Sequence, residues 1–254
     1  MSAPTLPAGW RLDARVTVGS TNEEARRLAL AGAAELTVVW ALEQTSGRGR
    51  RGRSWTSPSG NLYLSVVLRP EVPPGEAAQI GFVAAVALAE TLRQVLPPSG
   101  TISLKWPNDV LVNRRKVSGI LPEVVATGEA GQVDALVLGI GVNVAHHPPD
   151  TAWPATDLTE AGARVELERL MERLAAALDR WIRLWQTEGF APVRQRWKEQ
   201  ALPMGEPVEL RLEGRVLAGR FLDIDPEGAL VLGAADGSAQ LIRAGEVFFP
   251  GCEF

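Results

Sequence analysis

The sequence predicts an α+β protein, in which a mixed β-sheet packed with helices is followed by a small antiparallel β-barrel. In the first part, segments with alternating apolar residues are interspersed with segments whose apolar residues recur at helical spacing. In the last part, short alternating segments follow one another with turn residues between them. We therefore expect two domains, formed by residues 1–202 and residues 203–254.

The N-terminal half predicts a sheet with helices against one face. Hydroxyl caps at Ser20 and Thr21, with carboxylates shortly after, predict a helix that runs to about residue 31. Residues 36–42 and 62–68 alternate as strands do, and residues 80–95 carry apolar side chains at helical spacing.

The middle of the chain predicts further strands. Residues 101–106 alternate until Pro107 ends the strand, and a hairpin tip at 113–115 joins segments 110–112 and 117–121. In residues 136–144 one face is apolar, whereas the other carries Val137, Gly139, Gly141 and Asn143. Glycine on a strand indicates close approach, either by a ligand or by a tightly packed helix, and the sequence leaves both interpretations open.

Residues 166–185 predict a long amphipathic helix whose apolar stripe is core and not a cofactor site. A linker at 200–205 follows. The short strands expected beyond it are 208–212, 216–222, 229–232 and 240–242, with turns at 213–214, 225–228 and 236–237.

Composition excludes several classes of protein. With 26 Lys and Arg against 30 Asp and Glu, the chain has no broad basic footprint for nucleic acid. The first thirty residues predict no secretory signal, and the longest apolar stretch is too short to span a bilayer. One cysteine, Cys252, excludes an internal disulfide. We expect a cytoplasmic protein without membrane contact. His146 and His147 lie in a turn, so a Ser–His or Cys–His nucleophile is not expected.

Residues 45–56 concentrate positive charge in one segment, the arginine loop. It holds Arg48, Arg50, Arg51 and Arg53 between Gly47, Gly49 and Gly52. Guanidinium groups suit carboxylates and phosphates, so an anionic ligand is expected. The glycine spacing also fits a dinucleotide fingerprint, but a turn-rich stretch follows where a helix is needed. An RGG-like nucleic-acid segment conflicts with the acidic chain, and a solvated surface loop remains an alternative.

Three other stretches place polar residues in apolar surroundings: Lys105-Trp106-Pro107-Asn108-Asp109, residues 115–121 and residues 139–143. Together with Ser20-Thr21-Asn22 and the arginine loop, in this order, they closely resemble the catalytic domain of biotin protein ligases. The resemblance covers nearly the whole chain, and the C-terminal barrel resembles that family's SH3-like domain. It implies an enzyme that forms biotinyl-5'-AMP from biotin and ATP and transfers biotin to one lysine of a biotin carboxyl carrier protein.

The resemblance also implies the site residues. For biotin they are Ser20, Thr21, Asn22, Gln44, Gly47, Arg48, Gly49, Arg50, Lys116, Gly119 and Gly139. For ATP they are Arg48, Arg50, Arg53, Trp55, Lys105, Asn108, Asp109, Asn143 and Trp153. Arg50, Lys116 and Asp109 are implied as catalytic, with Asp109 also contacting Mg²⁺. Simple packing remains an alternative for Trp55 and Trp153, and a role for Asp109 as proton acceptor is a hypothesis.

Two alternatives to this activity remain. A lipoate-protein ligase uses related logic on another acid, although the arginine loop favours biotin. A non-catalytic module could hold biotin, but it would not require a nucleotide site. Only nine residues precede Trp10, too few for the helix-turn-helix domain of some relatives, so specific DNA binding is not expected. A homodimer is an expectation that the strands themselves do not decide.

Overall fold

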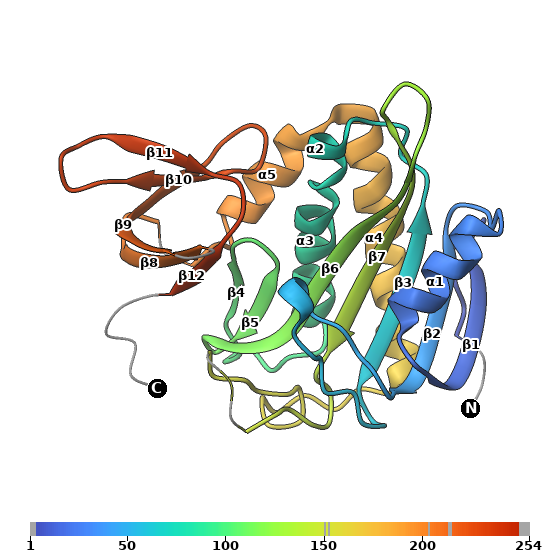
Figure 1. Ribbon diagram of the computed structural model, residues 1–254. Coiled ribbons are helices and arrows are strands. Elements are labelled where there is room, and N and C mark those ends of the chain that lie inside the picture. Colours follow the sequence, from blue (N-terminus) through green and yellow to red (C-terminus); the bar gives the residue numbers. More distant parts are fainter. Residues whose placement is uncertain (1–3, 150, 152, 203, 213–214, 249–254) are drawn as a thin grey trace.

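The computed structural model describes residues 4–149, 151, 153–202, 204–212 and 215–248. Seven strands form one sheet in the order β1-β2-β3-β7-β6-β5-β4 (Figure 1). The elements up to residue 198 are β1 Arg11–Val18, α1 Thr21–Leu30, β2 Thr37–Gln44, the 3₁₀ turn η1 Arg50–Gly52, β3 Leu62–Leu68, α2 Pro74–Ala77, α3 Ile80–Arg93, β4 Ile102–Lys105, β5 Asp109–Val112, β6 Arg115–Thr127, β7 Val133–Val142, α4 Leu167–Glu188 and α5 Phe190–Lys198. β1 and β2 are parallel and the other neighbours antiparallel, which confirms the mixed sheet.

The two faces of this sheet have different functions. In β2 and β3, and in β7 from Ala135 onward, residues of even number such as Leu64 and Leu138 join α3 and α4 in the main core. Residues of odd number face the other way, where Val67 and Val137 pack against Ala25 of α1. The expectation of helices against one face is therefore wrong, because α1 covers part of the second face. The rest of that second face carries the site described below.

A second, five-stranded antiparallel sheet has the order β11-β10-β9-β8-β12. Its strands are β8 Pro207–Leu212, β9 Arg215–Ile224, β10 Leu230–Gly233, β11 Ala239–Ile242 and β12 Glu246–Phe248. It is joined to the first part by polar contacts: Trp106 Nε1 donates to Gly228 O at 3.1 Å, and Arg194 Nε donates to Ile224 O at 2.6 Å. The predicted α+β fold class, with a small all-β part after the larger sheet, is confirmed.

Some elements were not predicted. β1 is an edge strand with mostly exposed side chains, so it lacks a buried apolar face to mark it. α5 contains Pro192, which a helix tolerates in its first turn but which hides the helical pattern. β12 has only three residues. Cys252, the turn at 213–214 and Pro203 of the linker lie outside the described residues.

By length and composition the helical stretch Pro74–Arg93 could cross a membrane. However, 78% of its apolar window is buried inside the protein, where α3 contacts α4 and the large sheet. Burial of this kind is typical of a core helix, which needs an apolar surface on all sides.

Candidate functional site

The floor of the site is a row of paired residues across four strands. Lys105 pairs with Asp109, Asp109 with Gly119, and Gly119 with Gly141. Directly paired residues point to the same face of a sheet. This is the face that α1 covers only in part, and Figure 1 shows the arginine loop with η1 crossing in front of it. Two charged side chains thus stand next to a strip of sheet without side chains.

The glycines of β6 and β7 provide room for other side chains. A Cβ at Gly141 would lie 2.6 Å from Trp55 Nε1, and one at Gly119 would lie 3.0 Å from Trp55 Cζ3. A Cβ at Gly139 would overlap the amide of Asn22 at the start of α1. Close packing of a helix is confirmed at Gly139, where the start of α1 approaches, whereas an indole from the arginine loop covers Gly141 and approach by a ligand stays a prediction.

At one end of the floor, the N-terminus of α1 forms a polar wall. The backbone N–H of Thr21 donates to Gln44 Oε1 at 2.8 Å, and Gln44 Nε2 donates to Ser57 Oγ at 2.9 Å. Ser20, Thr21 and Asn22 are all at least nine-tenths buried. Buried polar groups need partners, so this wall suits a small polar ligand group that can share its hydrogen bonds.

At the other end, two lysines hold one carboxylate. Lys116 Nζ lies 2.6 Å from Asp109 Oδ1 and Lys105 Nζ lies 3.3 Å from Asp109 Oδ2. Burial by itself would raise the pKa of Asp109, but the charges of Lys116 and Lys105 outweigh it and hold that pKa below its usual range. The Asp109 carboxylate is therefore an anion at neutral pH.

A β-bulge turns Lys116 toward the site. Asp109 pairs with Gly119 and Val110 with Ser118, but Leu111 then pairs with Lys116, so one residue of β6 is skipped. Bulges re-aim side chains in this way. In a regular strand without this shift, Lys116 would lie on the same face as Ser118 and point into the core.

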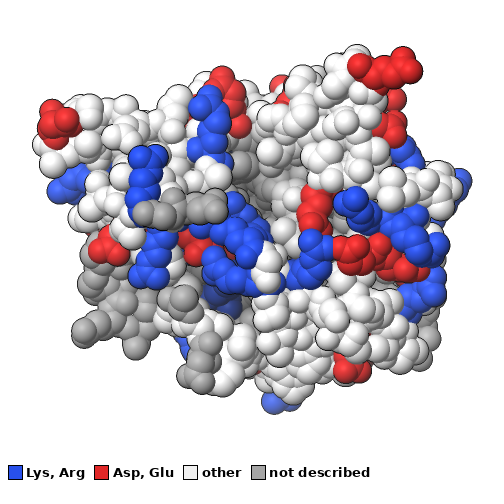
Figure 2. All heavy atoms as spheres, in the orientation of Figure 1, with Lys and Arg blue, Asp and Glu red and all other residues white. Residues whose placement is uncertain are grey.

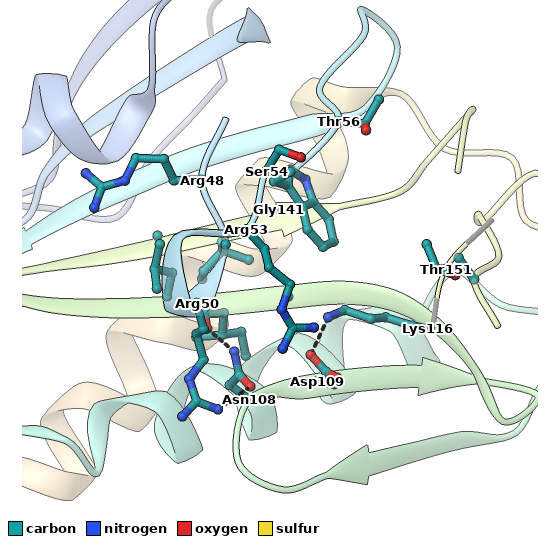
Figure 3. Close-up of a pocket in the computed structure, with 18 of the residues that line it drawn as sticks. Arg48, Arg50, Arg53, Ser54, Thr56, Asn108, Asp109, Lys116, Gly141 and Thr151 are labelled. Carbon is teal, nitrogen blue, oxygen red and sulfur yellow. Dashed lines mark hydrogen bonds and ion pairs between the residues drawn. The ribbon is translucent and has the colours of Figure 1, made fainter. Parts of the chain in front are cut away.

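The arginine loop is held by charges on both sides of the site. Arg48 forms ion pairs with Glu23 and with Glu123, the latter at 3.0 Å, whereas Arg53 pairs with Glu246 of β12. Arg50 NH1 donates to Asn108 Oδ1 at 3.2 Å. Figure 3 shows Asp109 and Lys116 pointing toward each other, with Arg48 directed away from them. Arg48 therefore anchors the loop in this conformation.

Arg50 carries charge that the protein only partly balances. Burial, and next the neighbouring Arg51, lower the pKa of the Arg50 guanidinium, which is the opposite of the direction for the surface-paired Arg15. Figure 2 shows Lys and Arg side chains gathered around a hollow in the middle of this face. An anionic ligand placed there would relieve the excess positive charge.

The small C-terminal sheet also contributes side chains. Phe248 of β12 lies 6.4 Å from Trp153, measured between ring centroids, and Lys105 Nζ lies 4.7 Å from the Trp153 ring. Trp153 Nε1 also donates to Arg114 O at 3.0 Å, so this side chain has a packing function as well. The two aromatic rings form an apolar wall beside the two lysines.

These parts enclose a cavity of about 530 Å³. Every predicted site residue except Gly47 lines it; a Cβ at Gly47 would collide with Trp55 O, so Gly47 shapes the loop from below. The sequence analysis did not predict the lining residues Ser54, Thr56, Trp106, Pro107, Ile120, Leu121, Ile140, Gly141, Pro148, Thr151, Ala155, Glu246 and Phe248. Glu246 and Phe248 could not be found by motif, because the pairing of β12 with β8 brings them in.

A separate group of His147, Asp157 and Glu160 has the donor types of a metal site. His147 Nδ1 lies 2.7 Å from Asp157 Oδ2, while Arg115 and Thr156 both donate to Glu160. The three side chains are already paired with one another and with neighbours, which is what the predicted structural role in a turn requires.

Comparisons with known proteins agree with this geometry. Residues 15–143 match the model of the biotin/lipoate A/B protein ligase family, and residues 204–249 match the biotin protein ligase C terminal domain. A biotin--[acetyl-CoA-carboxylase] ligase of Paracoccus denitrificans is 43% identical over 240 residues, covering 91% of this chain and 98% of that protein. The bifunctional ligase/repressor BirA of Bacillus subtilis is 34% identical, covering 89% of this chain and 70% of that protein.

Among solved structures, the biotin protein ligase of Aquifex aeolicus in complex with biotin and ATP superposes with a TM-score of 0.79. The two chains are 29% identical, and the match covers 94% of this chain and 97% of the other. At this level of similarity the two proteins share one architecture from the first sheet through the second.

Proposed function

This chain belongs to the biotin protein ligase family, and we propose that it makes biotinyl-5'-AMP from biotin and ATP and transfers biotin to one lysine of a biotin carboxyl carrier protein. The observation that supports this best is a cavity that has a polar wall at one end and cations at the other. Biotin has the same division, since its ring is neutral and polar and its tail ends in a carboxylate. We assign residues 1–202 to substrate binding and residues 203–254 to a domain that completes the nucleotide end.

The first step requires charge stabilisation and no general base. An oxygen of biotin's carboxylate forms a bond to the α-phosphorus of ATP, and the bond from that phosphorus to pyrophosphate breaks. The carboxylate is ionised at neutral pH, so no proton has to be moved. Arg50, Arg53 and Lys116 line the cavity where these anions would meet. Positioned cations hold the two anions together and stabilise charge that develops on the phosphates.

Biotin's place follows from the shape of the floor. We assign Ser20, Thr21, Asn22 and Gln44 to its ureido ring, because burying that polar head without partners would be costly. Gly119 and Gly139 line the cavity next to the polar wall, and we assign them to the apolar slot for biotin. Trp55 lies over Gly119 and Gly141, so it forms a wall of this slot, and we assign it to the tail of biotin as well as to the adenylate. Lys116 then stands where the tail ends.

The nucleotide end suits ATP with its magnesium ion. Lys105, Asn108, Asp109 and Asn143 line it beside Trp153, which we assign to the adenine ring. Of the described lining residues, Asp109 and Glu246 are the carboxylates. Mg²⁺ keeps several waters and binds through one or two carboxylates plus substrate phosphates, so Asp109 fits it as a ligand shared with ATP. When bound, the ion would neutralise charge on the phosphates.

In the second step the amine of the carrier lysine attacks the carbonyl carbon of the adenylate. AMP leaves with the electron pair, and the amine gives up one proton. Both Asp109 oxygens already accept from lysines and its pKa is held low, which argues against Asp109 as the acceptor of that proton. The rate at which Asp109→Asn transfers biotin from preformed adenylate distinguishes charge binding from proton transfer. An unchanged rate would mean that Asp109 is not the proton acceptor.

Exchange of labelled pyrophosphate into ATP tests the proposed activity. We expect exchange with biotin and none with lipoate. Exchange with lipoate alone would favour the lipoate-type ligase instead. Arg50→Gly should lower the rate at least about tenfold, since it removes a charged hydrogen bond to the reacting groups. Arg51→Gly is the matched control: Arg51 does not line the cavity, and its φ of 56° accommodates glycine. Biotin binding without exchange by the unaltered protein would leave a non-catalytic module.

We further propose a cytoplasmic protein, because its substrates ATP and carrier are cytoplasmic, and one without specific DNA binding, which a gel shift at moderate salt tests. Homodimer formation has one structural support. β1 is an edge strand with its outer side unpaired by any described strand, and Val16 on it is 72% exposed. Light scattering during gel filtration checks the mass.

A further inference from the structure

Glu123 on β6 contacts two parts of the site with its two carboxylate oxygens. Its Oε2 accepts from Asn22 Nδ2 at 2.6 Å, and its Oε1 accepts from Arg48 NH2 at 3.0 Å. Asn22 belongs to the polar wall and Arg48 to the arginine loop. One carboxylate, 30% exposed, thus holds both with its two oxygens.

The Asn22 side chain is held on three sides by partners inside the protein. Its Nδ2 donates also to Leu121 O at 3.2 Å, and its Oδ1 accepts from Ser65 Oγ at 2.6 Å. An amide has two N–H donors and a carbonyl oxygen with two lone pairs, so both hydrogens have partners and the oxygen keeps one lone pair for a ligand. With Asn22 only 5% exposed, Glu123 and Ser65 therefore fix which way this amide points.

The network continues from Asn22 back to the loop by a second route. Ser65 Oγ lies 2.8 Å from Thr21 Oγ1, which lies 3.1 Å from Gln44 Oε1. Beyond Gln44, Ser57 Oγ donates to Trp55 O at 2.8 Å. The network thus starts on the arginine loop at Arg48 and ends on it at Trp55, with the polar wall between. Buried networks of this kind act as a unit.

We propose that Glu123 is a positioning residue that couples occupation of the polar wall to the conformation of the arginine loop. It holds Asn22 for the ligand and Arg48 for the loop, so a shift at either residue is transmitted to the other. The inference rests on the proposed function, because it takes biotin's ring as the occupant of the wall. Glu123 does not line the cavity and acts only through these two residues.

Glu123→Gln tests the coupling, because glutamine can accept from Asn22 but offers Arg48 no negative charge. Glu23→Gln is the matched control. Glu23 pairs with the same Arg48, but its side chain is 52% exposed and, among the described residues, it forms no side-chain hydrogen bond with Asn22. The readouts are biotin and ATP KM and kcat in pyrophosphate exchange, and hydrogen exchange of amides 47–56 with and without biotin.

For Glu123→Gln we expect the KM for biotin to rise about tenfold, whereas the KM for ATP and kcat stay within about twofold of the unaltered protein. Amides 47–56 should exchange faster, and biotin should no longer slow them. Glu23→Gln should stay within about twofold of the unaltered protein. If Glu123→Gln does not fold, Glu123→Asp replaces it, since it keeps the charge but is too short to reach both partners; the same loss of loop protection is expected.

Equal behaviour of the Glu123 and Glu23 variants would overturn the coupling and leave the proposed function standing. Failure of the unaltered protein to bind biotin would overturn both. A lower kcat, whether biotin or ATP is the varied substrate, together with normal protection of the loop by biotin, would also contradict the inference. Such a result would place Glu123 in the chemical step.

Discussion

Gly141, at the floor of the site, has no room for a side chain beside Trp55. In Gly141→Ala the new methyl would lie 2.6 Å from Trp55 Nε1 and 2.8 Å from Trp55 Cε2, so the indole must move. Overpacking of this kind costs about 1–3 kcal/mol. We expect at least about tenfold weaker biotin binding by calorimetry. Gly75→Ala, where a Cβ meets nothing within 4 Å, should bind normally. Unchanged affinity in Gly141→Ala would mean that Trp55 does not wall the slot.

Asp109 is the residue on which the charges of the nucleotide end depend. Asp109→Asn leaves two lysines without their carboxylate, one of them, Lys105, only 6% exposed. Removing one partner from a buried ion pair costs about 3–5 kcal/mol. Chemical denaturation should show a loss of this size, and the double variant with Lys105→Met should recover part of it. A neutral single variant would contradict the buried network.

The pH dependence of this stabilisation follows from the sign of the shift. The pKa of Asp109 is lower in the folded protein than its ordinary value of about 3.9. Stability from such a group is complete above the unfolded pKa and is lost as the pH falls through the folded pKa. The difference between the unaltered protein and Asp109→Asn should therefore stay constant from about pH 8 to pH 5 and shrink only below about pH 4. Urea titrations across this range check it.

At this scale the sequence predicted the side chains that lie in contiguous motifs. Lys105, Asn108 and Asp109 stand out as polar residues in an apolar segment, and the resemblance to biotin protein ligases implied their place in the site. Glu123 belongs to no such motif, and a lone carboxylate on a strand looks like any solvated side chain. Its two partners lie about 100 and 75 residues away in the chain. Such a contact is visible only once the strands are paired.

At the scale of elements, α4 stabilises the fold through one apolar stripe. Leu178 on this helix is fully buried in the main core. Leu178→Ala should lower the free energy of unfolding by about 2–5 kcal/mol, through lost burial and the cavity left behind. Leu30→Ala at the end of α1, 62% exposed, should change it by less than about 0.5 kcal/mol. Comparable losses in the two variants, measured by urea unfolding, would contradict the assigned core.

Elements with a strong period were predicted nearly to their ends. The expected strand 62–68 coincides with β3, and the helix expected at 166–185 is α4, Leu167–Glu188. β1 was not predicted, because an exposed edge strand need not alternate apolar and polar residues. The bulge in β6 was not predicted either, because a shift of pairing depends on the partner strand. This bulge makes Lys116 face Asp109.

At the scale of the whole molecule, the two sheets meet at the nucleotide end of the cavity. Phe248 of the second sheet faces Trp153 of the first part. Phe248→Ala should therefore raise the KM for ATP about three- to tenfold, while biotin affinity stays unchanged, because an aromatic contact contributes about 0.5–1.5 kcal/mol. Phe248→Tyr keeps the ring and serves as control. An equal loss of affinity for both substrates would indicate a general loss of folding instead.

The order in which the cavity's residues occur along the chain sets the order in which its two ends can form. Residues of the polar wall and the glycine floor all precede Val142, whereas Glu246 and Phe248 come after both long helices and most of the second sheet. Domains tend to fold from the N-terminus during synthesis. The part of the chain that carries the polar wall and the glycine floor can therefore fold, once α4 has been added to its core, before Glu246 and Phe248 complete the other end of the cavity.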